Sequence, residues 1–402
     1  MPALDDTSRL LQDAAQFSRS WLFDSALPLW WARGADHQGG GFHEQLGLDG
    51  QAIGTPFRLR VQARQIFVYA RAGALGWNGP WQDAVAHGLE FMLARYARPD
   101  GFFRSTPVVS DDAVDLYDQA FVLFALAHAH TARPGDGRLL DVALALMRQI
   151  DGRLRVADGP GGYRATLASA TGMHANPHMH LLEALFAWME CGVSAPFRQQ
   201  AAQICDLALS RMIDPAHGGL GEHFGEGWSR PAAAEQCFEP GHQFEWAYLL
   251  IKAGKLLDLP AQPEALALER FAHAHGIDAQ RGVAIFSVDV SGRTLDARAR
   301  LWAQTERLRT YSLLLTENIG HPRRAAEELQ ASMGTLRRFL DVPVTGLWRE
   351  WMGLSGEFDA TPCPASSLYH LMTGMGELVA TTPTPPSPPS PPSPVLREKI
   401  LT

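Results

Sequence analysis

Six polar side chains recur at nearly regular intervals along this chain of 402 residues, each close to the start of an apolar segment. They are Arg64, Asp118, His180, His242, Glu306 and His370. Histidine changes its charge near neutral pH, so the three histidines could act as general acids or bases. The carboxylates could orient them or bind hydroxyl groups, and the arginine could stabilise an oxyanion. The set therefore favours a proton-transfer site built from distant parts of the chain.

The histidines follow sequence signals for the start of a helix. Pro240 suits a first helical turn, because its missing N–H would have no partner there, and an apolar run follows it. His242 then falls in the first turn, and Glu245 lies three residues later on the same face. We predict that Glu245 orients His242, although a capped helix with one buried histidine also explains this stretch. The same order recurs at Asn176, Pro177, His180 and Glu183, and at Pro364, Ser366 and His370.

A second pattern repeats with the same period in the long connections between the apolar segments. Each connection carries a glycine followed by an apolar residue: Gly41-Phe42, Gly101-Phe102, Gly162-Tyr163, Gly219-Leu220, Gly282-Val283 and Gly346-Leu347. A fixed period indicates repeat architecture, and a unit of this length holds two helices, a short turn and one long loop. We therefore predict six helical hairpins.

Apolar helices alternate with amphipathic ones, which predicts an inner and an outer ring. The segment from Gln119 to His130 is almost wholly apolar, as in a helix surrounded by others, whereas residues 137–150 are amphipathic. Closing six such hairpins gives an all-α fold, an α/α toroid (six-hairpin α/α barrel) with short β-hairpin loops at one rim, one of them at Leu48-Asp49-Gly50. All inner helices then run the same way, so the six polar residues should converge on one rim.

The composition is that of a globular domain and argues against several classes of protein. Hydrophobic residues make up 46% and charged residues 19%, and the net charge of −8 provides no basic surface for nucleic acid or an anionic membrane. We expect neither a transmembrane span nor a secretory signal. We expect one catalytic domain over residues 1–380, a Pro/Ser/Thr-rich tail over 381–402, reduced cysteines and a cytoplasmic location.

Aromatic residues near the predicted rim suggest a carbohydrate ligand. Trp302 shares a helix face with Glu306, and Trp246, Trp348 and Trp351 are further candidates. Aromatic rings stack on the apolar faces of sugars, while carboxylates, arginines and histidines bind hydroxyl groups. Tryptophans are also common in protein cores, so this feature alone supports a sugar only weakly.

Five segments, in order and at family-like spacing, resemble the N-acylglucosamine 2-epimerase superfamily. This group includes mannose isomerases, sulfoquinovose-related aldose–ketose isomerases and cellobiose 2-epimerases. The segments are Arg-Val-Gln-Ala-Arg-Gln (60–65), Asn-Pro-His-Met-His-Leu-Leu-Glu-Ala (176–184), Pro-Gly-His-Gln-Phe-Glu-Trp (240–246), Arg-Leu-Trp-Ala-Gln-Thr-Glu (300–306) and Ser-Leu-Tyr-His (367–370). The resemblance implies an α/α barrel of six hairpins and metal-free proton transfer beside a sugar carbonyl, without a cofactor.

The resemblance also implies roles for individual residues. His242 and His370 correspond to the acid/base catalysts of that group. The positions that bind or orient substrate correspond to Arg64, His180, Glu245, Trp302 and Glu306, to which we add Asp118, Glu183 and Trp348 as candidates. The implied reaction removes the C2 proton of an open-chain aldose to give a cis-enediolate. We expect mannose–fructose isomerisation, with N-acetylglucosamine/N-acetylmannosamine epimerisation as the alternative.

Other functions are compatible with parts of the pattern. An inverting glycoside hydrolase would pair Asp118 with Glu306 across a water molecule. A metal enzyme would use His178, His180 and His242, although side chains two residues apart on a helix diverge. A protein-binding scaffold would need none of these residues. The sequence leaves open which monosaccharide or disaccharide binds, whether a homodimer forms, and whether nucleotides activate the protein. A rim without a Lys/Arg cluster slightly favours a free sugar over a phosphosugar.

Overall fold

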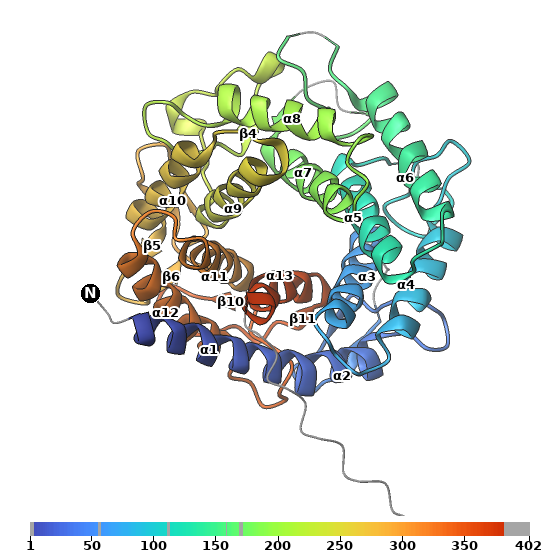
Figure 1. Cartoon of the computed structure of the whole chain (residues 1–402), viewed down its shortest axis with the longest axis horizontal. Helices are drawn as coiled ribbons and strands as arrows, with labels where there is room; N and C mark the ends of the chain where they lie inside the picture. The colour runs from blue at the N-terminus through green and yellow to red at the C-terminus, as the bar shows by residue number, and fades with distance from the viewer. Residues whose placement is uncertain (1–3, 55–57, 111–112, 158, 169–171, 382–402) are drawn as a thin grey trace, which may run out of the picture.

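The computed structural model describes residues 4–54, 58–110, 113–157, 159–168 and 172–381, and the proline-rich tail lies outside them. Its helices form two concentric rings (Figure 1). The inner ring contains α3 (Leu59–Ala74), α5 (Leu116–Ala132), α7 (Ala175–Glu190), α9 (Pro240–Leu257), α11 (Leu301–Thr316) and α13 (Ala365–Thr381). The outer ring contains α1 (Leu4–Ser20), α2 (Leu27–Leu29), α4 (Trp81–Arg95), α6 (Arg138–Gln149), α8 (Arg198–Leu207), α10 (Gln262–Gly276) and α12 (Pro322–Phe339). The predicted α/α toroid is confirmed.

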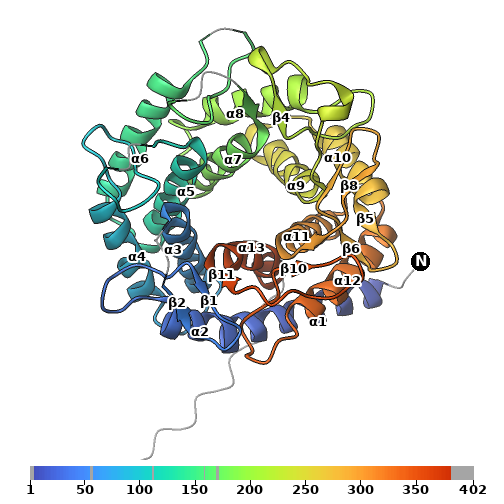
Figure 2. The ribbon, with the colours of Figure 1, turned by 180° about the vertical axis from the view of Figure 1, so that it is seen from behind.

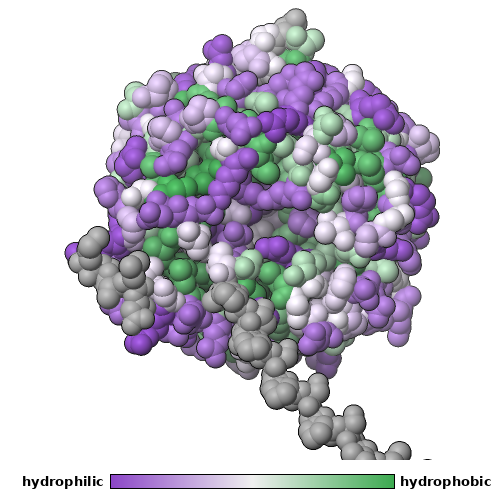
Figure 3. All heavy atoms as spheres, viewed as in Figure 1, coloured by the Kyte–Doolittle hydropathy of each residue, from purple (hydrophilic) through white to green (hydrophobic). Residues whose placement is uncertain are grey.

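Inner and outer helices differ in burial as their sequences predict. Every residue of α5 from Ala120 to Ala127 is buried, because this helix has neighbours on all sides. In contrast, α6 buries Leu139, Ala143, Leu146 and Met147, which recur at helical spacing on one face. The other faces of the outer helices meet solvent, and hydrophilic residues cover much of the surface seen in Figure 3.

Short elements connect the two rings. Outer helices continue into π-helical turns at Trp21–Ala26, Trp30–Gly34, Ile150–Leu154 and Ala208–Met212, and 3₁₀ turns form at Glu226–Trp228 and Ala233–Glu235. Antiparallel strand pairs join β3 (Met173–His174) to β4 (His223–Phe224), β5 (Ile277–Asp278) to β6 (Val283–Ala284), β7 (Ser287–Val288) to β8 (Thr294–Asp296) and β9 (Ala299–Arg300) to β10 (Trp351–Met352).

The barrel closes where the chain's beginning meets its end. Strand β1 (Gln45–Leu46) pairs with β2 (Ala52–Ile53) around the predicted hairpin turn and, on its other edge, with β11 (Cys363–Pro364). Helix α13 packs against both α3 and α1. Figure 2 shows these strands grouped near the ends of α3 and α13. No helix in the described ranges is long and apolar enough to cross a membrane.

A repeated buried contact fixes four of the long loops to inner helices and a fifth to β11. The side-chain amide of Gln62 binds both the N–H and the C=O of Phe42, at 2.7 and 2.8 Å. Gln119 holds Phe103, Gln243 holds Leu220 and Gln304 holds Ala284 in the same two-bond manner, while Cys363 contacts both backbone groups of Trp348. These contacts satisfy backbone groups that would otherwise be buried without partners. They explain why the glycine–apolar pairs keep the period of the helices.

Candidate active site

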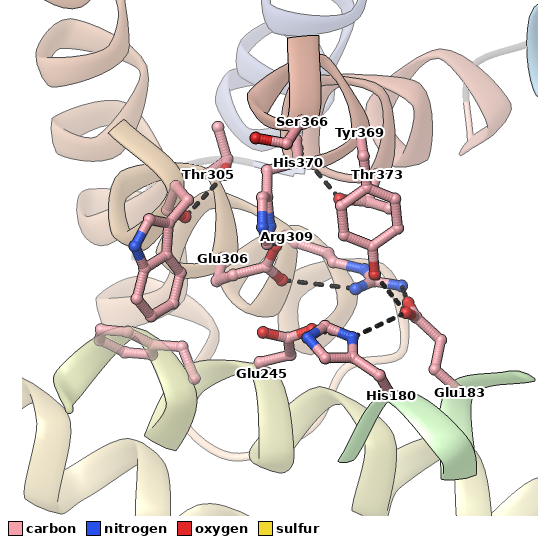
Figure 4. Close-up of polar contacts among 12 residues, drawn as sticks. His180, Glu183, Glu245, Thr305, Glu306, Arg309, Ser366, Tyr369, His370 and Thr373 are labelled. Carbon is pink, nitrogen blue, oxygen red and sulfur yellow. Dashed lines mark hydrogen bonds and ion pairs between the residues drawn. The ribbon is translucent and has the colours of Figure 1, made fainter. Parts of the chain in front are cut away.

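Two of the predicted residues form the central contact of the site. Nδ1 of His370, on α13, lies 2.7 Å from Oε1 of Glu306, on α11 (Figure 4). The other oxygen of Glu306 accepts a hydrogen bond of 3.3 Å from Nη1 of Arg309, one helical turn further along. Burial raises the pKa of Glu306 to about 7, against the opposing effect of Arg309. The pKa of His370 is well below its ordinary value because of burial and the nearby charge of Arg64.

A second buried carboxylate continues this network toward α7. Glu183 accepts a 2.9 Å hydrogen bond from Nη2 of Arg309 and another from the hydroxyl of Tyr369. Its Oε2 also lies 3.6 Å from Nδ1 of His180. Burial opposes ionisation of Glu183, but Arg309, His180 and Tyr369 together outweigh burial, so the pKa of Glu183 is lowered. Burial lowers the pKa of His180 to about 4, so this ring is neutral.

His242 has acidic partners that the sequence did not indicate. Its Nδ1 lies 2.9 Å from Oε2 of Glu222 and 3.7 Å from Oε2 of Glu239. Backbone bonds hold Glu222 between Ala175, the first residue of α7, and Cys237, just before α9. Burial by itself would lower the pKa of His242, but the two carboxylates outweigh burial and raise it to about 10. His242 is therefore an imidazolium ion near neutral pH.

The prediction that Glu245 orients His242 is wrong. Oε1 of Glu245 instead lies 3.8 Å from Nδ1 of His180, because one helical turn carries the carboxyl group deeper and toward α7. Neither oxygen of Glu245 has a hydrogen-bond partner within the described part of the chain. Burial, reinforced by Glu306 and Glu183, raises its pKa well above the ordinary value. Glu245 is thus a neutral acid that can donate a hydrogen bond.

Trp302 and Arg64 complete the cluster. The Trp302 ring lies 4.8 Å from the His242 ring and 5.7 Å from the His370 ring, between centroids. A Cβ at Gly241 would clash with this indole, so the glycine before His242 permits the close approach. Arg64 donates a 2.6 Å hydrogen bond to the Tyr117 hydroxyl and a 3.3 Å bond to the backbone oxygen of Ser366. The structure thus brings Arg64, His180, His242, Glu306 and His370 together, as predicted.

Asp118 and Trp348, which we predicted to bind substrate, have other neighbours in the structure. Asp118 is fully buried, and its Oδ1 lies 2.8 Å from Nε of Arg60, so its charge is already matched. Trp348 is fully buried too, and its ring stacks on Trp30 at 5.1 Å, in the packing against α2 and its flanking turns. The expectation that Trp348 contacts substrate is therefore not supported by its position; its apolar neighbours make it part of the core.

The three histidines considered as a metal site are not brought together. Nε2 of His178 accepts a 2.9 Å hydrogen bond from the Tyr163 backbone, and its Nδ1 lies 2.8 Å from the His174 carbonyl oxygen. His178 therefore takes the place that glutamine has in other repeats. Two other groups have ligand atoms within 4.8 Å of one another: His180, Glu183 and Glu245, and Glu222, Glu239 and His242. In these groups Arg309 and the imidazolium of His242 already compensate carboxylate charge.

Several members of the cluster were missed from the sequence. Arg309 lies three residues after Glu306, and Glu239 three residues before His242, so helical spacing could have indicated both. Tyr117 and Tyr369 each lie beside a residue that the analysis did select. Glu222 carries no local signal of this kind, because its loop belongs to the preceding repeat.

Known proteins resemble this chain in sequence and in fold. The model of the N-acylglucosamine 2-epimerase (GlcNAc 2-epimerase) family matches residues 40–374. The chain is 36% identical over 369 residues to a mannose-6-phosphate isomerase of Rhizobium meliloti (strain 1021), covering 89% of this chain and 95% of that protein. Among solved structures, the cellobiose 2-epimerase from Bacillus thermoamylovorans B4167 has a TM-score of 0.83 at 16% identity, over 92% of this chain and 99% of that one. A D-mannose isomerase gives a TM-score of 0.81 at 18% identity, over 95% of this chain and 100% of that one. At these identities the two structures show a common fold.

Proposed function

The chain belongs to the N-acylglucosamine 2-epimerase family, and we propose that it isomerises mannose and fructose by proton transfer between C1 and C2. It is an isomerase or epimerase, as the family and the mannose-6-phosphate isomerase relative indicate. The observation that carries the finer proposal is a pair of buried histidines in different protonation states. His370 is neutral, His242 is protonated with a pKa of about 10, and the Trp302 ring lies close to both.

The different protonation states of His370 and His242 suit two different steps of one reaction. His370, with Nδ1 held by Glu306, offers Nε2 as the base that removes the C2 proton of an open-chain aldose. The electron pair moves into the C1–C2 bond, and the C1 carbonyl oxygen takes a proton from the His242 imidazolium. Arg64 has no carboxylate partner in the described part of the chain, so its charge is free to stabilise the enediolate oxygens.

The same groups can complete the isomerisation. His242, now neutral, accepts the proton of the C2 hydroxyl, while His370 returns its proton to C1, and the product is the ketose. Because one base serves both carbons from one face of the enediolate, this route needs no second carbon acid. Epimerisation at C2, the alternative, requires His242 to deliver a proton to the opposite face of C2. The glycoside hydrolase alternative loses support, since Asp118 is paired with Arg60 and Glu306 with Arg309 and His370.

Whether the substrate carries a 6-phosphate is a question for experiment. Three arginines at or just before the starts of inner helices have carboxylate partners: Arg60 with Asp118, Arg298 with Asp296 and Arg300 with Glu350. This favours free mannose, whereas the name of the Rhizobium meliloti relative favours mannose 6-phosphate. A catalytic domain through residue 380, a separate tail, a cytoplasmic location and a homodimer stay predictions.

Proton NMR in deuterium oxide tests the proposal. Purified enzyme is given mannose, mannose 6-phosphate, N-acetylmannosamine or cellobiose in separate samples. We expect conversion of one of the two mannose substrates to the corresponding ketose, with solvent deuterium at C1 or C2 when exchange competes with transfer. His370→Ala should abolish conversion, while His178→Gln, at a histidine outside the cluster, should retain it. Turnover of N-acetylmannosamine to N-acetylglucosamine would establish the epimerase instead, and no change in any sugar would refute both.

A further inference from the structure

Arg309 lies between two of the three buried carboxyl groups of the site. Its guanidinium binds Glu306 through one nitrogen and Glu183 through another, at 3.3 and 2.9 Å, and it is only 5% exposed. It also lies over the Tyr248 ring, 3.9 Å from the ring centroid. The third carboxyl group, Glu245, makes no hydrogen bond to it. Arg309 therefore binds both Glu306 and Glu183 and leaves Glu245 without a hydrogen-bond partner in the described part of the chain.

Arg309 and His370 bind different oxygens of Glu306, Oε2 and Oε1 respectively. Arg309 lines, together with Glu183 and Tyr248, a cavity of about 860 Å³ between the C-terminal halves of the inner helices. His370, His242, Trp302 and Arg64 are not among the residues that line this cavity. Arg309 thus forms part of the layer that separates the cavity from the catalytic histidines, and it meets His370 only through Glu306.

We propose that Arg309 is a positioning residue that keeps Glu306 ionised and thereby holds His370 with its hydrogen on Nδ1 and its lone pair on Nε2. An ionised Glu306 can only accept a hydrogen bond, so Nδ1 of His370 must carry the proton. A protonated Glu306 would donate to Nδ1 instead, and the ring hydrogen would move to Nε2, where the base is needed. The tautomer can be tested by itself, whereas the kinetic consequence rests on the proposed isomerase function.

Among the charged groups around Glu306, Arg309 has the largest effect in keeping the Glu306 carboxyl group ionised. The charged and titratable groups around it come from all the neighbouring helices: His180 and Glu183 on α7, Glu245 on α9, Arg309 on α11, Tyr369 and His370 on α13, and Arg64 on α3. Burial and Glu183 raise the pKa of Glu306, while Arg309 is the main group that lowers it, giving about 7. Without Arg309 the pKa of Glu306 must rise, and the active tautomer appears only at higher pH.

The test compares pH profiles of kcat in Arg309→Gln, Arg309→Lys and the wild type. We expect the acid limb of the wild type near pH 7 and a shift of about one to three units upward in Arg309→Gln, as expected on removing an opposite charge at this distance. Because the wild-type pKa of Glu306 is about 7, this corresponds to a loss of kcat of about fivefold or more at pH 7, with KM little changed. In Arg309→Lys, which keeps the positive charge, the acid limb should lie close to its wild-type pH.

The matched control is Arg307→Gln, which removes another buried arginine of α11 whose partner is Glu328. It should lower stability without moving the acid limb.

¹⁵N NMR of labelled histidine supplies a readout that needs no sugar: at pH 8, His370 should change from the Nδ1–H to the Nε2–H form in Arg309→Gln. An unmoved tautomer and acid limb would overturn the proposal, as would a limb that moves equally in Arg307→Gln. If Arg309→Gln does not fold, an Arg309→Lys variant with the wild-type tautomer supports the proposal and an Nε2–H form contradicts it.

Discussion

Replacing Glu222 by glutamine should change the charge of His242 without moving its ring. Glu222 is 3% exposed, its Oε2 lies 2.9 Å from Nδ1 of His242, and glutamine keeps the shape of the side chain while removing the charge. The pKa of His242 is raised from the ordinary histidine value of 6.5 to about 10, although burial opposes this rise. Because Glu222 is the largest of the favourable contributions, its loss should lower the pKa of His242 substantially.

The magnitude follows from the buried pair. Loss of one opposite charge at this distance shifts a pKa by one to three units, so we expect a value of about 8 in Glu222→Gln. The imidazolium fraction at pH 9 then falls from about 0.9 to about 0.1, whereas at pH 7 it stays above about 0.9. A shift of about two units corresponds to about 3 kcal/mol of lost preference for the charged ring.

The assay is kcat/KM for the sugar that turns over, measured from pH 6 to pH 10.5. The wild type should lose activity through about pH 10, as His242 loses its proton, and Glu222→Gln should lose it through about pH 8. Glu239→Gln is the comparison, because its carboxylate is further away, at 3.7 Å, and should move the limb less. An unmoved alkaline limb in Glu222→Gln would refute the reasoning, and a uniform loss at all pH values would show that geometry, not charge, had changed.

Three further variants test the environment of the site. Glu245→Gln replaces a neutral acid with a neutral amide, so kcat and thermal stability should change little, and a large loss of activity would show that Glu245 must ionise. His178→Ala should cost about 1–3 kcal/mol in urea unfolding, because the buried N–H of Tyr163 loses its acceptor, whereas His178→Gln should restore most of it. Trp348→Ala should cost about 3–5 kcal/mol with KM unchanged, and a raised KM at undiminished stability would return Trp348 to the substrate site.

Local patterns in the sequence were sufficient to predict the architecture. Period, helix-start signals and the alternation of apolar with amphipathic segments depend on neighbours within one repeat, and they gave the two rings and the hairpin between β1 and β2. The same period placed His180, His242, Glu306 and His370 in corresponding turns of their helices. Once the ring closes, corresponding turns must meet, so this part of the cluster was determined before any tertiary contact was known.

Tertiary structure decided which acid serves which histidine and which groups are charged. Helical spacing fixed the face on which Glu245 lies, but the rotation of α9 against α7 placed it beside His180, and a loop of another repeat supplied Glu222 to His242. Charge depends on burial and on every ion within a few ångströms, and those neighbours come from several helices at once. The sequence by itself therefore determined that His180, His242, Glu306 and His370 meet at the rim. Only the packed barrel decided that His242 carries a proton, that His370 does not, and that Arg309 lies behind Glu306.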